Sequence, residues 1–279
     1  MTKPLFLDTT IQVDRILKAE PPALLVPLRS LLAQFDYFIA CSYSRLEFKR
    51  VVIQGLGLIL NYLCEEQSFF RALQRAQAVG GGRSRRASTL VSIMAWIGFR
   101  IDEQVEVILG EGIDRQMAIK AESYVRNAIR FLWKRFDKSV DSIQDGTQCK
   151  RAVEGPKPKA DGSFEVSIPR SKCKTKECNN ANFFQSNLPL LKRLRDELQR
   201  LSQEAGRTKF TEELDAALEH VTAAISNPSR LYDYENCIGV GDVWLHLECV
   251  AAGVKDFATT NYKESQVLCP MMGLTMRQP

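Results

Sequence analysis

The sequence predicts an α/β fold with a central parallel sheet and a long, mostly helical insertion. Two short apolar runs near the start, residues 5–7 and 36–41, suit buried strands, and a helical pattern follows each of them. The resulting order of strand, helix, helix, strand and helix favours a parallel, right-handed arrangement. Near the other end, a helix over residues 242–252 precedes a short strand that ends in polar residues by residue 261, which returns the chain to the same sheet.

Composition limits the class of protein. A chain of 279 residues forms one large domain or a domain with an insertion, and it is long enough to bury roughly three quarters of its unfolded surface. The longest apolar stretch, residues 51–64, is too short and too interrupted to span a bilayer, and the start lacks the pattern of a signal peptide. We therefore expect a cytoplasmic protein with no membrane partner. The net charge of +5 permits contact with a polyanion without demonstrating one.

Three acids stand where apolar segments start or stop. Asp8 follows the first strand, at the edge of the sheet where open α/β proteins place their ligands. Glu47 falls in the first turns of the helix after the second strand, and Asp242 opens the later helix. Each acid also has a simpler explanation. Asp8 and Asp242 suit helix N-caps, and Ser44 and Glu47 have the spacing of a capping box.

The middle of the chain reads as a helical insertion, with helical periodicity over residues 51–76, 89–100, 114–138, 188–203 and 211–226. We expect a core made of residues 1–65 and 230–279 and an insertion of residues 66–229, with a polar, basic excursion at about 145–180. After three glycines, Arg83, Arg85 and Arg86 could contact phosphates, since arginine offers paired donors. A solvated loop explains them equally well.

Eight cysteines without a secretory signal predict reduced thiols, most of them small core residues. Cys149, Cys173 and Cys178 lie in or just after the polar excursion, and with a fourth ligand they could hold a structural zinc. The chain has no CxxC motif, and neither of its two histidines is near these cysteines in sequence. Zinc is therefore not among the expected cofactors.

Several of these segments resemble the PIN-domain nucleases, the metal-dependent α/β family that includes toxins of toxin–antitoxin pairs and enzymes of RNA processing and decay. The similar segments are the first strand with Asp8, residues 42–47 after the second strand, Gly241-Asp242 at the later helix, and residues 258–261. The resemblance covers about residues 1–65 and 230–275. It implies a PIN-like three-layer fold and nuclease activity, more often on RNA than on DNA.

The resemblance also implies roles for individual residues. It makes Asp8, Glu47 and Asp242 the catalytic acids, which bind one or two Mg²⁺ or Mn²⁺ ions. The family often has a fourth acid near the later strand, where this chain has Asn261, with Glu264 three residues further on as the substitute ligand. The expected substrate-binding residues are these: Arg45, Lys49, Arg83, Arg85, Arg86, Thr260 and Asn261.

Elementary electrostatics supports such a group of acids independently of any family. Two carboxylates about 4 Å apart repel by roughly 4 kcal/mol at an effective dielectric near 20, so converging acids bind cations or take up protons. Oxygen ligands favour Mg²⁺ or Mn²⁺ over zinc. The alternative is a non-catalytic scaffold whose insertion binds nucleic acid, a protein partner or an inhibitor. A nucleotide-binding protein is disfavoured because no phosphate loop is visible. A homo-oligomer is compatible with every one of these interpretations.

Overall fold

The computed structural model describes residues 2–17, 26–81, 85–102, 112–160, 164, 178–204, 209–226 and 234–279. Five strands form one sheet in the order β3-β2-β1-β4-β5, and every neighbouring pair is parallel. The predicted parallel α/β architecture is therefore confirmed. The strands are β1 (Pro4–Leu7), β2 (Tyr37–Cys41), β3 (Ser142–Gln144), β4 (Asp256–Ala258) and β5 (Thr275–Arg277).

Helices cover both faces of this sheet, so its central strand is buried on both sides. Leu5 and Leu7 of β1 pack with α1 (Thr9–Leu17) and α2 (Val26–Leu32) on one face. Phe6 points to the other face, where its ring stacks on Phe257 of β4 at 5.8 Å between centroids. The three-residue apolar run has no polar alternation because neither face meets water.

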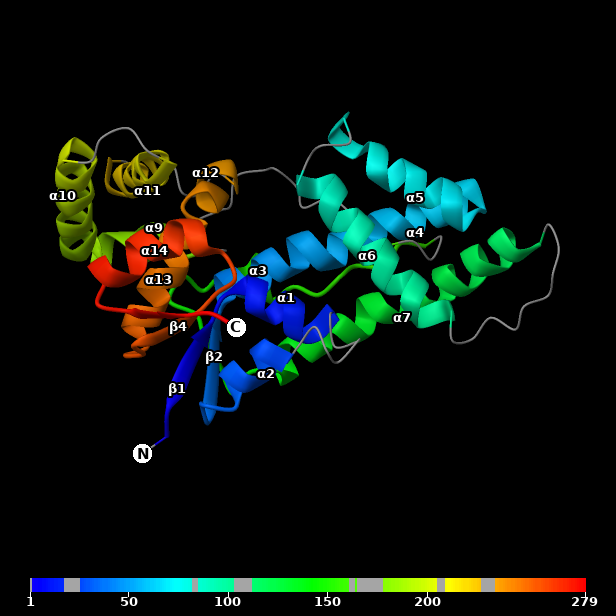
Figure 1. Cartoon of the computed structure of the whole chain (residues 1–279), viewed down its shortest axis with the longest axis horizontal. Helices are drawn as coiled ribbons and strands as arrows, with labels where there is room; N and C mark the ends of the chain where they lie inside the picture. The colour runs from blue at the N-terminus through cyan, green and yellow to red at the C-terminus, as the bar shows by residue number, and fades with distance from the viewer. Residues whose placement is uncertain are drawn as a thin grey trace.

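The helices α13 (Gly241–Ala251) and α14 (Tyr262–Met271) lie on the Phe6 face. Packed in the same cluster are α3 (Ser42–Phe48), α8 (Lys150–Val153), α9 (Asn180–Ser186), α10 (Leu188–Glu204) and α11 (Lys209–Ser226). The short helix α12 (Tyr234–Gly239) leads into α13. Figure 1 shows α9 to α12 gathered with α13 and α14 at one end of the molecule.

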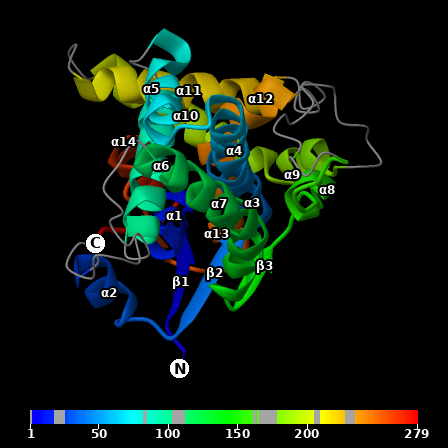
Figure 2. The same cartoon turned by 90° about the vertical axis from the view of Figure 1, so that its right-hand side faces the viewer.

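A second group of helices lies at the other end of the molecule (Figure 1) and faces the viewer in Figure 2. It contains the π-helix η2 (Lys49–Ile53), α4 (Gln54–Glu66), α5 (Phe69–Ala78), the 3₁₀ turn η3 (Val79–Gly81), α6 (Arg85–Asp102) and α7 (Ile113–Lys138). The single helix expected over residues 51–76 breaks at Gln67. This residue adopts a left-handed conformation with φ 48° and ends α4, and Ser68 then caps α5.

One strand of the sheet lies inside the range expected to be an insertion. β3 pairs with β2 from Ile39 to Cys41, so residues 66–229 contribute to the sheet as well as to the helices. The expected excursion at 145–180 contains the short helix α8, and much of the rest, residues 161–163 and 165–177, lies outside the described residues. The segment expected to be a mostly helical insertion thus also supplies one edge strand of the sheet.

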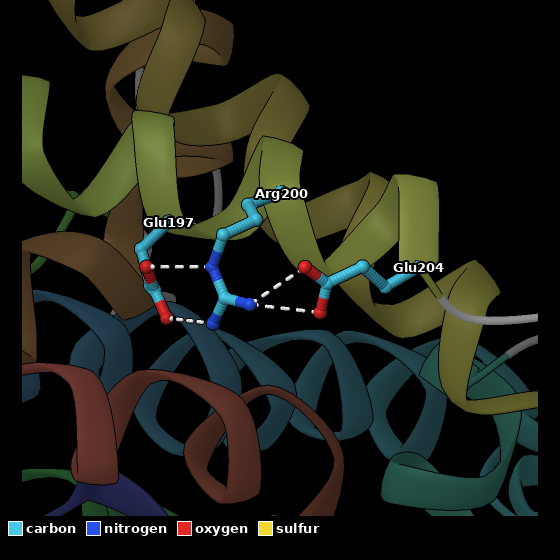
Figure 3. A network of polar contacts seen from close by, with 3 residues as sticks. All are labelled: Glu197, Arg200 and Glu204. Atoms are coloured by element: carbon cyan, nitrogen blue, oxygen red, sulfur yellow. Dashed lines mark hydrogen bonds and ion pairs between the residues drawn. The ribbon is translucent and has the colours of Figure 1, made fainter.

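Charged side chains also pair on the outer surface, as on α10. Arg200 donates hydrogen bonds to both oxygens of Glu204 at 2.7 Å and to Glu197 one turn earlier (Figure 3). All three side chains are well exposed, so this network adds little to stability. In the described part of the chain, no helix has the length and apolar character needed to cross a membrane.

Candidate acidic site at the strand ends

Asp8 stands directly after β1, and its carboxylate is buried and held on both oxygens. The Thr9 N–H donates to Oδ1 at 2.5 Å, while the hydroxyls of Thr259 and Thr10 donate to Oδ2 at 2.6 and 2.8 Å. Because α1 begins at Thr9, Asp8 does occupy the N-cap position. Burial nevertheless raises the pKa of Asp8, although the hydrogen bonds from Thr259 and Thr10 lower it.

Thr259 connects Asp8 to the end of β4 and to the acid on α14. Its side chain is fully buried, and its hydroxyl oxygen accepts the Asn261 N–H at 2.8 Å. The side chain of Asn261 then donates from Nδ2 to Oε2 of Glu264 at 2.7 Å. Thr260 is exposed and donates its N–H to the Thr10 hydroxyl at 3.1 Å. This chain of contacts fixes the strand ends around Asp8.

Glu47 belongs to the same group of acids. Burial raises the pKa of Glu47, and the negative charges of Asp8 and Glu264 raise it further. The Thr9 hydroxyl lies close enough to lower this pKa, but it is buried without a full hydrogen bond. The capping-box interpretation of Glu47 is wrong. The helix α3 begins two residues before Ser44, at Ser42, and has no side-chain cap.

Asp242 lies in the first turn of α13, and its interpretation as an N-cap is also wrong. The N-cap is Val240, without a side-chain hydrogen bond. Buried Tyr43 lies close to both Asp242 and Glu47, so the helices that carry these two acids, α13 and α3, are neighbours. Burial raises the Tyr43 pKa well above its usual value, and the negative charges of Glu47 and Asp242 raise it further. The Tyr43 ring also packs against Trp244 of α13 at 4.9 Å between centroids.

The bases beside Glu47 are placed differently from one another. Arg45 pairs with Asp137 and lies over the Trp133 ring, and Lys49 donates to the carbonyl oxygens of Arg151 and Glu154. The head groups of Arg45 and Lys49 therefore have partners within the chain. By contrast, the Arg50 guanidinium lies 3.7 Å from the Glu47 carboxylate. Sequence reasoning missed Arg50, although its i,i+3 spacing from Glu47 was visible.

The remaining predicted bases cannot be placed. Arg83 lies outside the described residues, as do the side chains of Arg85 and Arg86, whose backbone begins α6. Cys173 is also outside them. Cys149 and Cys178 are buried, and Asn180 donates to the sulfurs of Cys178 and Cys237, each at 3.3 Å. The roles expected for these arginines remain predictions, as does the expectation that the cysteines hold no zinc.

Two further buried groups on α13 were also missed. The His246 ring is buried one turn after Asp242, and its Nδ1 lies 2.7 Å from the Asp242 carbonyl oxygen. Glu248 is buried and accepts hydrogen bonds from Trp244 Nε1 at 3.1 Å and from the Gly146 N–H at 3.0 Å. Glu248 thereby ties α13 to the segment after β3. The sequence offered one signal for these two groups, a histidine and a glutamate within an otherwise apolar helix.

Fold and site together define an α/β protein with a parallel sheet and a group of carboxylates at the carboxyl ends of its strands. Searches against protein-family models, curated proteins and solved structures found no match for this chain. Within the described residues, no three His, Cys, Asp or Glu side chains are arranged as a ready-made metal site. The carboxylates still suit a hard cation in charge and ligand type, because Glu47 is held beside two other negative groups.

Proposed function

We propose that this chain is a metal-dependent endonuclease of the PIN-like kind, hydrolysing phosphodiester bonds in RNA rather than DNA. One observation carries the proposal: the negative charges of Asp8 and Glu264 both raise the pKa of Glu47. Acids from three separate segments thus influence one another electrostatically, at the sheet edge where parallel α/β proteins bind ligands. The preference for RNA rests on the family resemblance alone.

In this proposal, Asp8, Glu47, Asp242 and Glu264 would hold Mg²⁺ or Mn²⁺ through carboxylate oxygens. A bound ion of this kind lowers the pKa of water and stabilises the charge that develops on a phosphate. The threonine hydroxyls of Thr259 and Thr10 keep Oδ2 of Asp8 in one orientation.

Other residues would position the acids or the substrate. Asn261 orients the Glu264 carboxylate through its Nδ2 donor. Thr260 is exposed beside this group, where its hydroxyl is available to a phosphate oxygen. Arg50 supplies a guanidinium next to Glu47, and guanidinium groups bind phosphates through paired donors. Together these residues provide a polar surface around the acids for a polyanionic strand.

Cleavage of a labelled single-stranded RNA in the presence of Mg²⁺ or Mn²⁺ tests the proposal. Asp8→Asn and Glu47→Gln should each lower the rate by about a hundredfold or more, because a lost ligand removes several kcal/mol of transition-state stabilisation. Glu204→Gln, a change of the same kind on exposed α10, should cleave like the wild type. Full activity in both site variants would refute the assignment of these acids.

The second candidate is a non-catalytic scaffold that binds nucleic acid or a protein partner. The placement of Arg45 and Lys49 favours it. Arg45 is engaged with Asp137, and Lys49 is engaged with backbone carbonyl groups. Fluorescence anisotropy with the same RNA separates the two candidates. Binding without cleavage in either metal ion supports the scaffold, whereas cleavage that depends on Asp8 supports the nuclease.

A further inference from the structure

His246 is held rigidly at the edge of the acidic site. It follows Asp242 by one helical turn, and its ring stacks on Phe257 of β4 with 4.4 Å between centroids. Phe257 in turn stacks on Phe6 of the central strand. The negative charge of Glu264 acts on the imidazole and raises its pKa, although burial lowers that pKa much more, to about 4. Glu264 is therefore within electrostatic reach of the His246 ring.

Hydrogen bonding determines which ring nitrogen carries the proton. Nδ1 lies 2.7 Å from the backbone oxygen of Asp242, and a carbonyl oxygen can only accept. Nδ1 must therefore carry the hydrogen, and in a neutral ring this leaves a free lone pair on Nε2. The hydrogen-bond partner of Nδ1, the Asp242 carbonyl oxygen, thus sets the tautomer of the neutral ring.

Nε2 itself makes no hydrogen bond within the described residues. The ring is 1% exposed, and Nε2 is buried without a hydrogen-bond partner in the described structure. A buried acceptor left without a partner is destabilising, so such groups usually serve a ligand or an ordered water. The Thr9 hydroxyl, close to Glu47, is another buried polar atom without a full hydrogen bond.

We propose that Nε2 of His246 is a nitrogen ligand for the cation bound by the acidic site, and that it biases this site toward Mn²⁺ over Mg²⁺. The inference rests on the proposed function and adds the identity of the ion. A histidine that binds a metal through one nitrogen commonly donates its other N–H to a backbone carbonyl, which is the arrangement of His246 and Asp242. Both ions suit carboxylate oxygens, but Mn²⁺, as a transition-metal ion, accepts an imidazole nitrogen beside them more readily than Mg²⁺ does.

Pulsed electron paramagnetic resonance of Mn²⁺ added to the full chain tests the inference without any assay of activity. An imidazole nitrogen bound to Mn²⁺ should modulate the echo, and growth on ¹⁵N-labelled histidine should change the frequencies. The chain has two histidines. His220→Gln on α11 should keep the signal, and His246→Gln should lose it. The second variant should also weaken Mn²⁺ binding by about tenfold or more, with little change for Mg²⁺.

The outcomes separate this inference from the proposed function. Bound Mn²⁺ without nitrogen modulation in the wild-type protein would overturn the role of His246 and leave a carboxylate-only site intact. Failure of the wild-type protein to bind either ion would overturn both. The isotope comparison uses unsubstituted protein, so a His246→Gln variant that fails to fold does not prevent a decision. Loss of the signal in His220→Gln alone would also contradict the assignment.

Discussion

The hydroxyl of Tyr43 lies against the backbone of Gly241, where an added Cβ would stand 1.8 Å from it and 2.0 Å from the ring carbon Cζ. Tyr43 belongs to the helix that carries Glu47, and Gly241 immediately precedes Asp242. Only a residue without a side chain lets these two elements approach this closely. The contact therefore sets the distance between two of the proposed ligands.

Gly241→Ala should destabilise the protein by about 1–3 kcal/mol, the usual cost of forcing atoms into a packed core. Chemical denaturation measures this cost. Tyr43→Leu provides the matched test, since it removes the ring that clashes. The cost of Gly241→Ala should be smaller in the Tyr43→Leu background. Equal costs in both backgrounds would show that the clash is absorbed elsewhere.

Thr259→Val should leave the fold intact and lower activity by about tenfold or more. The substitution removes the hydroxyl that donates to Oδ2 of Asp8 at 2.6 Å, and hydrogen bonds to charged groups contribute about 1.5–3 kcal/mol. Thr259→Ser keeps the donor and should restore most of the rate. The check is RNA cleavage at saturating metal. A serine variant as inactive as the valine variant would mean that the hydroxyl donor alone does not sustain the rate, which would contradict the role assigned to this hydrogen bond.

Arg50→Gln should weaken RNA binding about three- to tenfold, because Arg50 offers a guanidinium beside Glu47. Arg50→Lys keeps the charge and should lose less. Arg200→Gln removes an exposed arginine from α10 and serves as the control with unchanged binding. Anisotropy titrations at two salt concentrations make the comparison, since loss of a phosphate contact also reduces the salt dependence. An equal loss in the Arg200 variant would point to a general charge effect.

Glu248 should make the protein less stable as the pH rises. Burial raises the pKa of this carboxyl above its ordinary value of 4.5, so the folded state holds the proton more tightly than the unfolded chain. Between these two pKa values the folded state binds more protons, and the free energy of unfolding therefore falls as pH increases. Below 4.5 this contribution is fully present, and above the raised value it is lost.

Glu248→Gln should flatten this pH dependence. The amide oxygen still accepts from Trp244 and Gly146, and the side chain no longer titrates. Urea unfolding of both proteins from pH 4.5 to 8 measures the difference between them, which cancels the other titrating groups. Glu204→Gln, on the exposed face of α10, should match the wild type. A difference that stays constant with pH would refute the role of Glu248.

The sequence predicts the parts of this structure that depend on local patterns. The apolar runs at β1 and β2 and the helices of the middle segment are found close to their observed bounds, apart from the break at Gln67. β3 and β5 escape detection because each has three residues and no fully buried side chain, which leaves no apolar run to recognise. Glu47 was selected correctly as a member of the acid group, but its local spacing from Ser44 suggested a cap that the start of α3 rules out.

The partners of the acids could not be predicted in the same way. Thr259 meets Asp8 across 251 residues of sequence, and Tyr43 meets Ile238 across 195. The pattern of residues within a segment carries no information about contacts with such distant segments. His246 lies on an otherwise apolar helix and is buried. Its proposed role as a ligand depends on an unpaired nitrogen that only the three-dimensional structure shows.

The pairing of β1 with β4 also has a consequence for the timing of synthesis. The ribosome makes Asp8 first and Glu47 soon after it, yet Thr259 and Glu264 emerge only some 250 residues after Asp8. Before then the nascent chain carries Asp8 without the hydroxyl that orients it. The proposed activity therefore cannot arise during translation until β4 and the residues that follow it have emerged and have paired with the rest of the sheet.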